Sequence, residues 1–454
     1  MLGLAVLLAG CASHRPWINL PLSAPLSATP TEAELRPLPP PDRQQVMMAV
    51  TLSGGGARAA AFGLGVLREL KATAFTLEGR PTTLLDHTIL ISGVSGGSIL
   101  AAHFAAFGDA TLTRFEPEFL LMPFESRLIR EAIWPRRLYE LTSPWYGRSQ
   151  ILAQRFDELF EGRTFADVQR RPGAPELMIT ATDLTSGAPF DFTAEQFQRI
   201  CSDLGATPLS FAVAASSAVP LLLSPLTVRN YADTCPHPTT SAHAAASAEG
   251  TGYRSRLLLR SADAYGNARD KPFIHLVDGG VADNLGVRLM LDRWVTLGSM
   301  SANFAGVKPG TIRRLVLVTV NSERGLTERV DNSDRVPTTT QVLETLIFGA
   351  GSRETEQTLA LLNDDTKRWL AEMERARGQP DSPFAADAEI HVVSVSLHDV
   401  PDDKMRHSLL RVPTAFTIEA NDVIELQLAG SAALSASPAF QALRRSLAAL
   451  GGAP

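Results

Sequence analysis

Gly93-Val94-Ser95-Gly96-Gly97 is the stretch that decides the fold, because it places a serine between a strand and a helix. The apolar run 88–91 before it predicts a short buried strand, and the small-residue run 98–104 after it predicts a helix. A serine on such a tight turn keeps its hydroxyl exposed at the positive end of the helix dipole. The pattern indicates a nucleophile for acyl transfer, although an ordinary Gly/Ser turn has the same letters.

A triple glycine lies about 40 residues upstream, again between a predicted strand and a predicted helix. The run 46–52 predicts the strand, Ser53-Gly54-Gly55-Gly56-Ala57-Arg58 follows it, and 59–70 predicts the helix. Backbone N–H groups of such a loop converge on one point and can bind an anion, either a phosphate or the oxyanion of a tetrahedral intermediate. No Gly-Lys-Ser/Thr follows the glycines, which excludes a Walker A phosphate loop.

A third stretch, Asp278-Gly279-Gly280, directly follows the apolar run 273–277. A carboxylate at the end of a buried strand can meet a residue at the end of another strand. Asp-Gly is also common in ordinary β-turns, so this stretch acquires meaning only beside the other two.

Together the three stretches resemble the patatin-like phospholipase family, over roughly residues 45–290. The resemblance implies that Ser95 is the nucleophile and Asp278 the general base of a catalytic dyad. It implies that the oxyanion N–H donors are Gly54, Gly55 and Gly56. Arg58 is implied either to steady that loop or to contact a lipid phosphate. The family needs no metal or organic cofactor, and none is expected here.

The base poses a physical problem, because a free aspartic acid has a pKa of about 3.9, far below that of a serine hydroxyl. Asp278 can act only if it hydrogen-bonds Ser95 and is partly desolvated, which raises its pKa. A Ser-Asp-His triad of the α/β-hydrolase type is the alternative, and the late histidines His391, His398 and His407 are its candidates. The Asp-Gly-Gly stretch and the glycine loop favour the dyad.

The resemblance implies a serine acyl hydrolase that cleaves fatty-acyl esters of phospholipids or lysophospholipids through an acyl-enzyme. An acyltransferase that hands the acyl group to another alcohol is a second hypothesis. A non-catalytic lipid-binding envelope protein that retains the fold is a third.

Strands that alternate with helices predict a three-layer α/β/α fold around a mostly parallel central sheet. Further strands are predicted at 177–182, 315–320 and 390–397. Helices are predicted over 341–377, with a break near 349–351, and as a pair around Gly430 within 416–450. We expect an acyl hydrolase domain at 45–430, with a loop-rich insertion at about 230–270, and a C-terminal helix at 431–454.

The N-terminal run Leu4-Ala5-Val6-Leu7-Leu8-Ala9-Gly10-Cys11 resembles the lipobox of bacterial lipoproteins. The resemblance implies that 1–11 is a signal segment and that Cys11 carries a lipid, although no Lys or Arg precedes the run. Residue 12 is Ala rather than Asp, which favours an outer-membrane location facing the periplasm. The Pro-rich stretch 12–44 predicts an extended tether between the lipid anchor and the enzyme.

Composition limits the remaining possibilities. The chain has 454 residues, 45% of them hydrophobic and 20% charged, with a net charge of −6, which does not suggest a nucleic-acid partner. The sequence contains no run of about 18 apolar residues, so no transmembrane helix is predicted. Besides Cys11, the chain has Cys201 and Cys235, which either pair in an oxidising compartment or remain thiols. The oligomeric state is left open.

Overall fold

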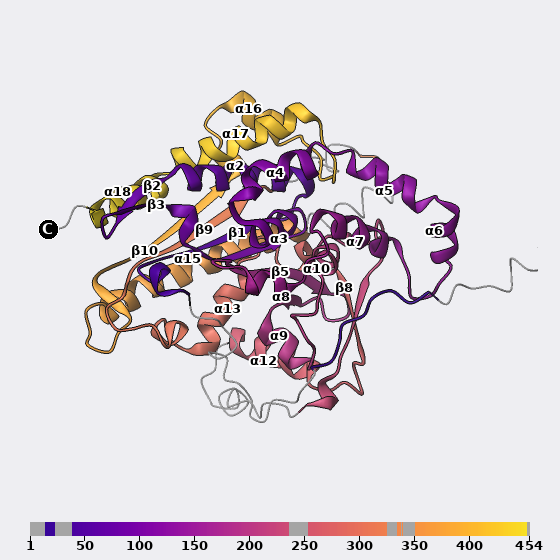
Figure 1. Cartoon of the computed structure of the whole chain (residues 1–454), viewed down its shortest axis with the longest axis horizontal. Coiled ribbons are helices and arrows are strands. Elements are labelled where there is room, and N and C mark those ends of the chain that lie inside the picture. Colours follow the sequence, from indigo (N-terminus) through magenta and orange to yellow (C-terminus); the bar gives the residue numbers. More distant parts are fainter. Residues whose placement is uncertain are drawn as a thin grey trace, which may run out of the picture.

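In this computed structural model the described residues are 14–22, 39–235, 253–324, 334–336, 338 and 350–451. Within them the chain builds an eight-stranded sheet in the order β10-β9-β1-β4-β5-β8-β7, with β6 beside β5, and a separate hairpin β2-β3 (Figure 1). The strands are β1 Val46–Leu52, β2 Ala74–Leu77, β3 Arg80–Thr83, β4 Thr88–Val94, β5 Glu176–Asp183, β6 Pro189–Phe192, β7 Leu226–Arg229, β8 Phe273–Val277, β9 Ile312–Asn321 and β10 Phe384–Ser396.

The central part of the sheet is parallel, and one end of it is antiparallel. The pairs β10–β9, β9–β1, β1–β4 and β4–β5 all run parallel. Strand β8 runs antiparallel to both β5 and β7, and β6 runs antiparallel to β5. The expected mostly parallel sheet is therefore confirmed, with its antiparallel part at the end that carries β8.

Helices cover both faces of the sheet, which confirms the three-layer α/β/α fold (Figure 1). The helices are α2 Gly56–Ala72, α3 Gly96–Phe107, α4 Thr111–Phe115, α5 Phe124–Ala132, α6 Pro135–Glu140, α7 Arg148–Leu159, α8 Phe165–Arg170, α9 Ala194–Arg199, α10 Leu209–Ser216, α12 Tyr253–Tyr265, α13 Arg288–Leu297, α15 Ala350–Ala376, α16 Asp403–Leu409, α17 Ala420–Ala436 and α18 Pro438–Gly451.

The two faces bury alternate side chains of the same strands. Along β1, Met48 and Val50 belong to the larger apolar cluster, which also contains side chains of α2, α3 and α17. Met47 and Ala49, which alternate with them along the strand, face the opposite side and join a smaller cluster with α13 and α15. In β9, Val318 and Leu317 divide in the same way. This two-residue alternation is what a strand covered on both faces requires.

The predicted pair of helices within 416–450 is present, but the predicted break at Gly430 is wrong. Helix α17 runs through Gly430, and the break comes between α17 and α18, at Ser437 and Pro438. The glycine serves close packing instead, because a Cβ atom there would lie 2.2 Å from the carbonyl oxygen of Phe62 in α2. A predicted boundary at 430/431 therefore falls inside a continuous helix.

Residues 14–22 differ from the extended tether predicted for 12–44, because they form a strap against the body. The side chain of Asn19 is fully buried, and its Nδ2 donates to Ser202 Oγ at 2.8 Å and to the carbonyl of Arg229 at 2.8 Å. The rings of Trp17 and Phe211 lie 4.7 Å apart. Buried polar groups with satisfied hydrogen bonds, together with an aromatic contact, fix this segment. Residues 12–13 and 23–38 of the predicted tether lie outside the described residues.

The predicted insertion at 230–270 is not loop alone, because its described part includes a helix and buried side chains. Residues 236–252 lie outside the described residues, but 253–265 form helix α12. Asn230 and Tyr265 are buried, and Asn230 Nδ2 donates to the carbonyl of Tyr265 at 2.9 Å. Cys201 and Cys235 form a disulfide with Cα atoms 6.1 Å apart.

Two further predictions concern regions that the structure covers only in part. Cys11 and residues 341–349 of the predicted helix lie outside the described residues. Helix α15 is continuous from Ala350 to Ala376, so residue 351 does not interrupt it. Among the helices that the structure describes, none is both long enough and apolar enough to cross a bilayer.

Candidate active site

Ser95 occupies the turn between β4 and α3, in a backbone conformation that residues other than glycine rarely adopt. Its φ is 48° and its ψ is −120°, and strand β4 ends one residue before it. Its backbone N–H donates to Ser216 Oγ at 2.8 Å, and its carbonyl accepts from Ser98 Oγ at 2.6 Å. A non-glycine residue held at positive φ stores strain that the surrounding structure must support. This is the turn that the first stretch predicts.

The glycines around Ser95 allow backbones to touch where any side chain would collide. A Cβ atom on Gly96 would lie 2.0 Å from the carbonyl oxygen of Gly56, and one on Gly97 would lie 2.3 Å from that of Leu52. The serine turn is therefore packed directly on the loop that joins β1 to α2. Gly56, Gly96 and Gly97 are therefore required by this contact between the two loops.

The structure brings Asp278 to Ser95. Ser95 Oγ donates to Asp278 Oδ2 at 2.9 Å, and the backbone N–H of Gly280 donates to Oδ1 at 2.8 Å. The Asp278 backbone is held on both sides, because its N–H donates to the carbonyl of Ala218 at 2.9 Å and its carbonyl accepts from Thr182 Oγ1 at 2.8 Å. Strand β8 arrives antiparallel to β5, so Asp278 reaches the serine from the opposite direction to β4.

The environment of Asp278 makes it a stronger base than a free carboxylate. Burial raises the pKa of Asp278 to about 6, against the hydrogen bonds from Gly280 and Ser95, which lower it. Its side chain lies almost wholly out of water, at 8% exposure. Desolvation disfavours the ionised form, so the group still ionises at neutral pH while holding a proton more tightly than usual.

The glycine loop lies against Ser95, but its three N–H groups are not equivalent. Gly54 donates its backbone N–H to the carbonyl of Asn284 at 3.0 Å, so this group is already used. Gly55 and Gly56 have φ angles of 139° and 62°, and their N–H groups have no acceptor among the described residues. The predicted set of oxyanion donors therefore narrows to Gly55 and Gly56, because a donor already bonded within the protein cannot stabilise an oxyanion.

Arg58 supports the glycine loop through hydrogen bonds to neighbouring backbone carbonyls. Its Nε donates to the carbonyl of Ser322 at 3.1 Å, and its Nη1 donates to the carbonyl of Val412 at 2.8 Å. Ser322 in turn donates its Oγ to the carbonyl of Gly54 at 3.0 Å. Arg58 is only 3% exposed, so of the two predicted roles these contacts fit the loop support and not the contact with a lipid phosphate.

The late histidines lie away from the serine. His398 is exposed beyond the end of β10, and β10 is three strands from β4, roughly 14 Å at the usual strand spacing. His391 pairs with Glu389 at 3.0 Å, and Nδ1 of His407 bonds the carbonyl of Asp403 at 2.6 Å. In the described part of the chain no histidine contacts Ser95 or Asp278. Ser95 and Asp278 therefore meet without a histidine beside them among the described residues.

The sequence analysis did not identify Asn284, which joins the segment after Asp278 to the glycine loop. Its carbonyl holds Gly54, and its Oδ1 lies 2.6 Å from where a Cβ on Gly54 would stand. Its backbone N–H donates to Glu354 Oε2 at 3.2 Å. Position 284 carries no signal of its own in one sequence, because the role depends on contacts between segments about 230 residues apart.

Several solved structures are distantly similar to this chain. Human GIVD cytosolic phospholipase A2 is 12% identical with a TM-score of 0.43, and the match covers 90% of this chain and 61% of that one. VipD from Legionella pneumophila is 12% identical with a TM-score of 0.27, over 93% of this chain and 72% of that one. The type III effector protein ExoU is 17% identical with a TM-score of 0.23, over 59% and 61%.

The family comparison is more informative. None of the curated proteins matches the chain. The model of the family described as patatin-like phospholipase matches residues 50–291, more than half of the 454 residues. The matched region contains the glycine loop, Ser95 and Asp278, the same three stretches that meet in the structure. The chain therefore belongs to the patatin-like phospholipase family.

Proposed function

We propose that the protein is a serine lipid acyl hydrolase that cleaves fatty-acyl esters of phospholipids or lysophospholipids with Ser95 and Asp278. The observation that carries the proposal is the 2.9 Å hydrogen bond from Ser95 Oγ, on its strained turn, to the buried carboxylate of Asp278. A nucleophile bonded to a base of raised pKa is the arrangement that acyl transfer needs. Membership of a phospholipase family supports lipids as the substrate class.

The proposed reaction has two stages. Ser95 Oγ attacks the acyl carbonyl carbon while its proton moves to Asp278, and the backbone N–H groups of Gly55 and Gly56 stabilise the oxyanion. The carbonyl re-forms as the ester C–O bond breaks, and the proton on Asp278 passes to the departing alcohol oxygen. A water molecule then attacks the acyl-enzyme, gives a proton to Asp278 and releases the fatty acid, while Ser95 Oγ regains its proton.

A fluorophosphonate probe tests the nucleophile without assuming a substrate. We expect wild-type protein to be labelled at Ser95 and to release fatty acid from mixed phospholipid vesicles, and Ser95→Ala to do neither. Labelling with a new ester in place of free fatty acid would favour the acyltransferase. Absence of labelling in folded wild-type protein would contradict the proposal and favour a non-catalytic lipid-binding protein.

We propose also that Cys11 carries a lipid that anchors the protein in the bacterial cell envelope, facing the periplasm. The lipobox-like run that ends at Cys11 supports this location. Growing cells with an alkyne fatty acid tests it, because wild-type protein should take up the label and fractionate with membranes. Cys11→Ala should lose the label, and equal labelling of this variant would contradict the anchor.

A further inference from the structure

Helices α5 and α6 extend from one end of the molecule, away from the sheet (Figure 1). We call residues 121–148 the arm. The arm carries seven of the eighteen large apolar side chains that are exposed in the described chain. They are Leu121, Ile129, Ile133, Trp134, Leu138, Tyr139 and Trp145. Ile133 is 63% exposed and Trp134 65% exposed. Such a concentration in 25 residues marks an interaction surface, because single exposed apolar residues are usually scattered.

The opposite side of the arm is fixed to the body, so its exposed side chains are held outward. Phe124 is buried in the main apolar cluster, and Leu128 packs against that cluster. Glu125 Oε1 accepts the backbone N–H of Phe416 at 2.7 Å. Ile129 and Ile133 are four residues apart, and a four-residue spacing places helical side chains on one face. The arm is therefore anchored along one side and apolar on the other.

The arm is also basic, in a chain whose net charge is −6. Its five arginines outnumber its three glutamates, for a net charge of +2. Two of its acids are paired with arginines: Glu140, only 5% exposed, pairs with Arg136 at 3.0 Å and Arg137 at 2.6 Å. Glu131 pairs with Arg155 at 3.1 Å. Positive charge beside aromatic and aliphatic side chains is the pattern of a helix that lies on an anionic membrane surface.

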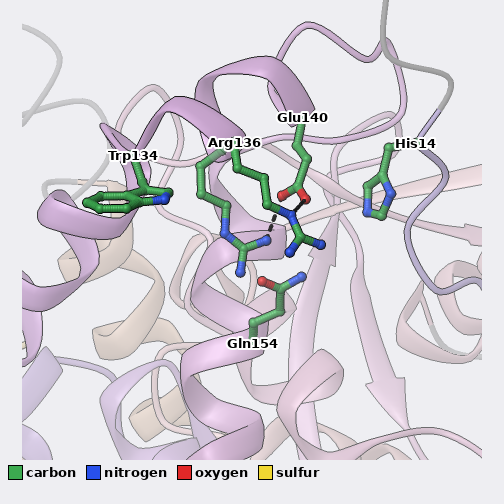
Figure 2. Close-up of a pocket in the computed structure, with 6 residues that line it drawn as sticks. His14, Trp134, Arg136, Glu140 and Gln154 are labelled. Carbon is green, nitrogen blue, oxygen red and sulfur yellow. Dashed lines mark hydrogen bonds and ion pairs between the residues drawn. The ribbon is translucent and has the colours of Figure 1, made fainter.

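A hollow of about 360 Å³ opens between α6 and α7 (Figure 2). The side chains of Trp134, Arg136, Glu140 and Gln154 line it, and the strap contributes His14. Two guanidinium groups share the single carboxylate of Glu140, so the hollow retains positive charge. A phosphate is the headgroup chemistry that suits it, because guanidinium groups bind phosphate oxygens well.

The N-terminal strap reaches the same place. Ser143 Oγ donates to the carbonyl of His14 at 2.7 Å, and the guanidinium of Arg15 lies 4.1 Å from the ring centroid of Trp145. Only residues 12 and 13 lie between Cys11 and His14, so an extended chain would span about 10 Å from one to the other. A lipid on Cys11 would therefore enter the bilayer beside the arm.

The arm also contacts the segment that follows Ala218, the residue whose carbonyl holds Asp278. Arg148, at its end, donates Nη2 to the carbonyl of Leu221 at 2.7 Å. Leu221 and Leu222 are 60% and 68% exposed, and they follow Ala218, whose carbonyl holds Asp278. Exposed apolar side chains thus lie both on the arm and on the segment that follows Ala218.

We propose that the arm docks the protein on an anionic phospholipid bilayer, with its apolar side chains in the headgroup region and its arginines on lipid phosphates. This goes beyond the proposed hydrolysis and does not require Cys11 to be lipidated, because the arm presents both the apolar and the charged contacts.

Vesicle flotation of the full chain carrying Cys11→Ser tests the arm without the anchor. Vesicles of phosphatidylcholine with a quarter phosphatidylglycerol are the probe. We expect Ile129→Ser, Ile133→Ser and Trp134→Ser together to lower the partition coefficient at least about tenfold. The matched control, Leu370→Ser, Ile424→Ser and Leu428→Ser, removes three exposed apolar side chains elsewhere, at 44%, 51% and 59% exposure. It should change partitioning by less than about twofold.

A charge variant protects the test against a folding defect. Arg127→Gln with Arg130→Gln leaves the apolar side chains in place and should lower binding to anionic vesicles about fivefold or more, while added salt weakens wild type similarly. Binding to pure phosphatidylcholine should not change. Equal partitioning of wild type and a folded arm variant would overturn the proposal. So would a wild-type dimer that the arm variant converts to a monomer without any vesicle binding, which would make the arm a self-association surface.

These measurements are independent of catalysis. Hydrolysis of a soluble short-chain ester by the arm variant should equal that of wild type, because the arm side chains do not touch Ser95 or Asp278. If no ester is cleaved by any form, flotation still decides the docking proposal, and only the proposed hydrolase function fails.

Discussion

The turn at Ser95 and the arm differ in what they keep from water. At the turn polar groups are buried: Ser95 is 7% exposed and Asp278 8% exposed. On the arm the large apolar side chains of Ile133 and Trp134 face outward. The buried site depends on close backbone contacts, so the addition or removal of one atom there should change activity. The arm depends on composition, so its side chains can be exchanged without disturbing the fold.

The largest effect on activity is expected when the Oγ atom of Ser95 is removed from the turn. Ser95→Ala should lower kcat/KM for a soluble ester by about 10⁴-fold or more, because the nucleophile is lost. Steady-state kinetics measure this. His398→Ala is the control, since His398 is exposed beyond β10 and should leave activity within about twofold. Equal losses in both variants would return the triad to consideration.

Adding one carbon atom to the turn should also be severe. Gly96→Ala would place a Cβ 2.0 Å from the carbonyl oxygen of Gly56, so the serine turn and the glycine loop must separate. We expect at least about a hundredfold loss of kcat/KM and a fall of about 3 kcal/mol in the free energy of unfolding. Gly266→Ala, where the nearest heavy atom would be 3.4 Å away, is the matched control. Kinetics and denaturant unfolding of both variants provide the comparison.

Asp278→Asn should separate activity from stability. Activity should fall at least about a hundredfold, because an amide cannot take the serine proton. The unfolding free energy at pH 7 should rise by about 1–3 kcal/mol, because the fold no longer buries a charge whose pKa it raises to about 6. The gain should shrink as pH falls from about 6 towards 4, where folded wild type takes up the proton. A variant less stable than wild type at pH 7 would contradict this account.

The pH profile gives a gentler test of the same carboxylate. Since Asp278 must be ionised to act and burial raises its pKa to about 6, kcat/KM should fall tenfold per pH unit below about pH 6. Activity that held down to pH 4.5 would mean that Asp278 is not the base. A soluble ester is the right substrate, because vesicle binding by the arm depends on charge as well.

The smallest effect is expected on the arm. The variant with Ile129→Ser, Ile133→Ser and Trp134→Ser should change the unfolding free energy by no more than about 1.5 kcal/mol, because exposed side chains contribute little. Thermal unfolding at equal protein concentration measures it. A loss as large as that of Gly96→Ala would show that the arm is packed against something, and the comparison with the buried turn would fail.

The two glycine-rich turns could be predicted from the sequence because their signal is local. Each consists of an apolar run, a turn that needs glycine and a helix, and strands β1 and β4 and helices α2 and α3 appear where they are expected. The pairing of Ser95 with Asp278 needed the family resemblance, because β8 enters the sheet antiparallel, and nothing in its five residues shows this direction.

The errors have a common physical cause, since each arises from a long-range contact. Gly430 looks like a helix break, but it serves the contact between α17 and α2. Gly54 looks like an oxyanion donor, but its N–H is taken by Asn284. The strap looks like a tether, but Asn19 finds partners about 180 and 210 residues away. A single sequence does not show partners at such distances.

The docked strap has a practical consequence for handling the protein. Residues 20–22 exchange backbone hydrogen bonds with 201–203, beside the Cys201–Cys235 disulfide. A recombinant chain that starts at residue 23, in order to remove the whole Pro-rich region, would uncover the ring of Phe211 and leave Ser202 without its partner Asn19. Shortened forms should therefore begin no later than His14. If a form that begins later is less soluble, the cause would be the exposed surface around Ser202 and Phe211 and not a defect of the catalytic domain.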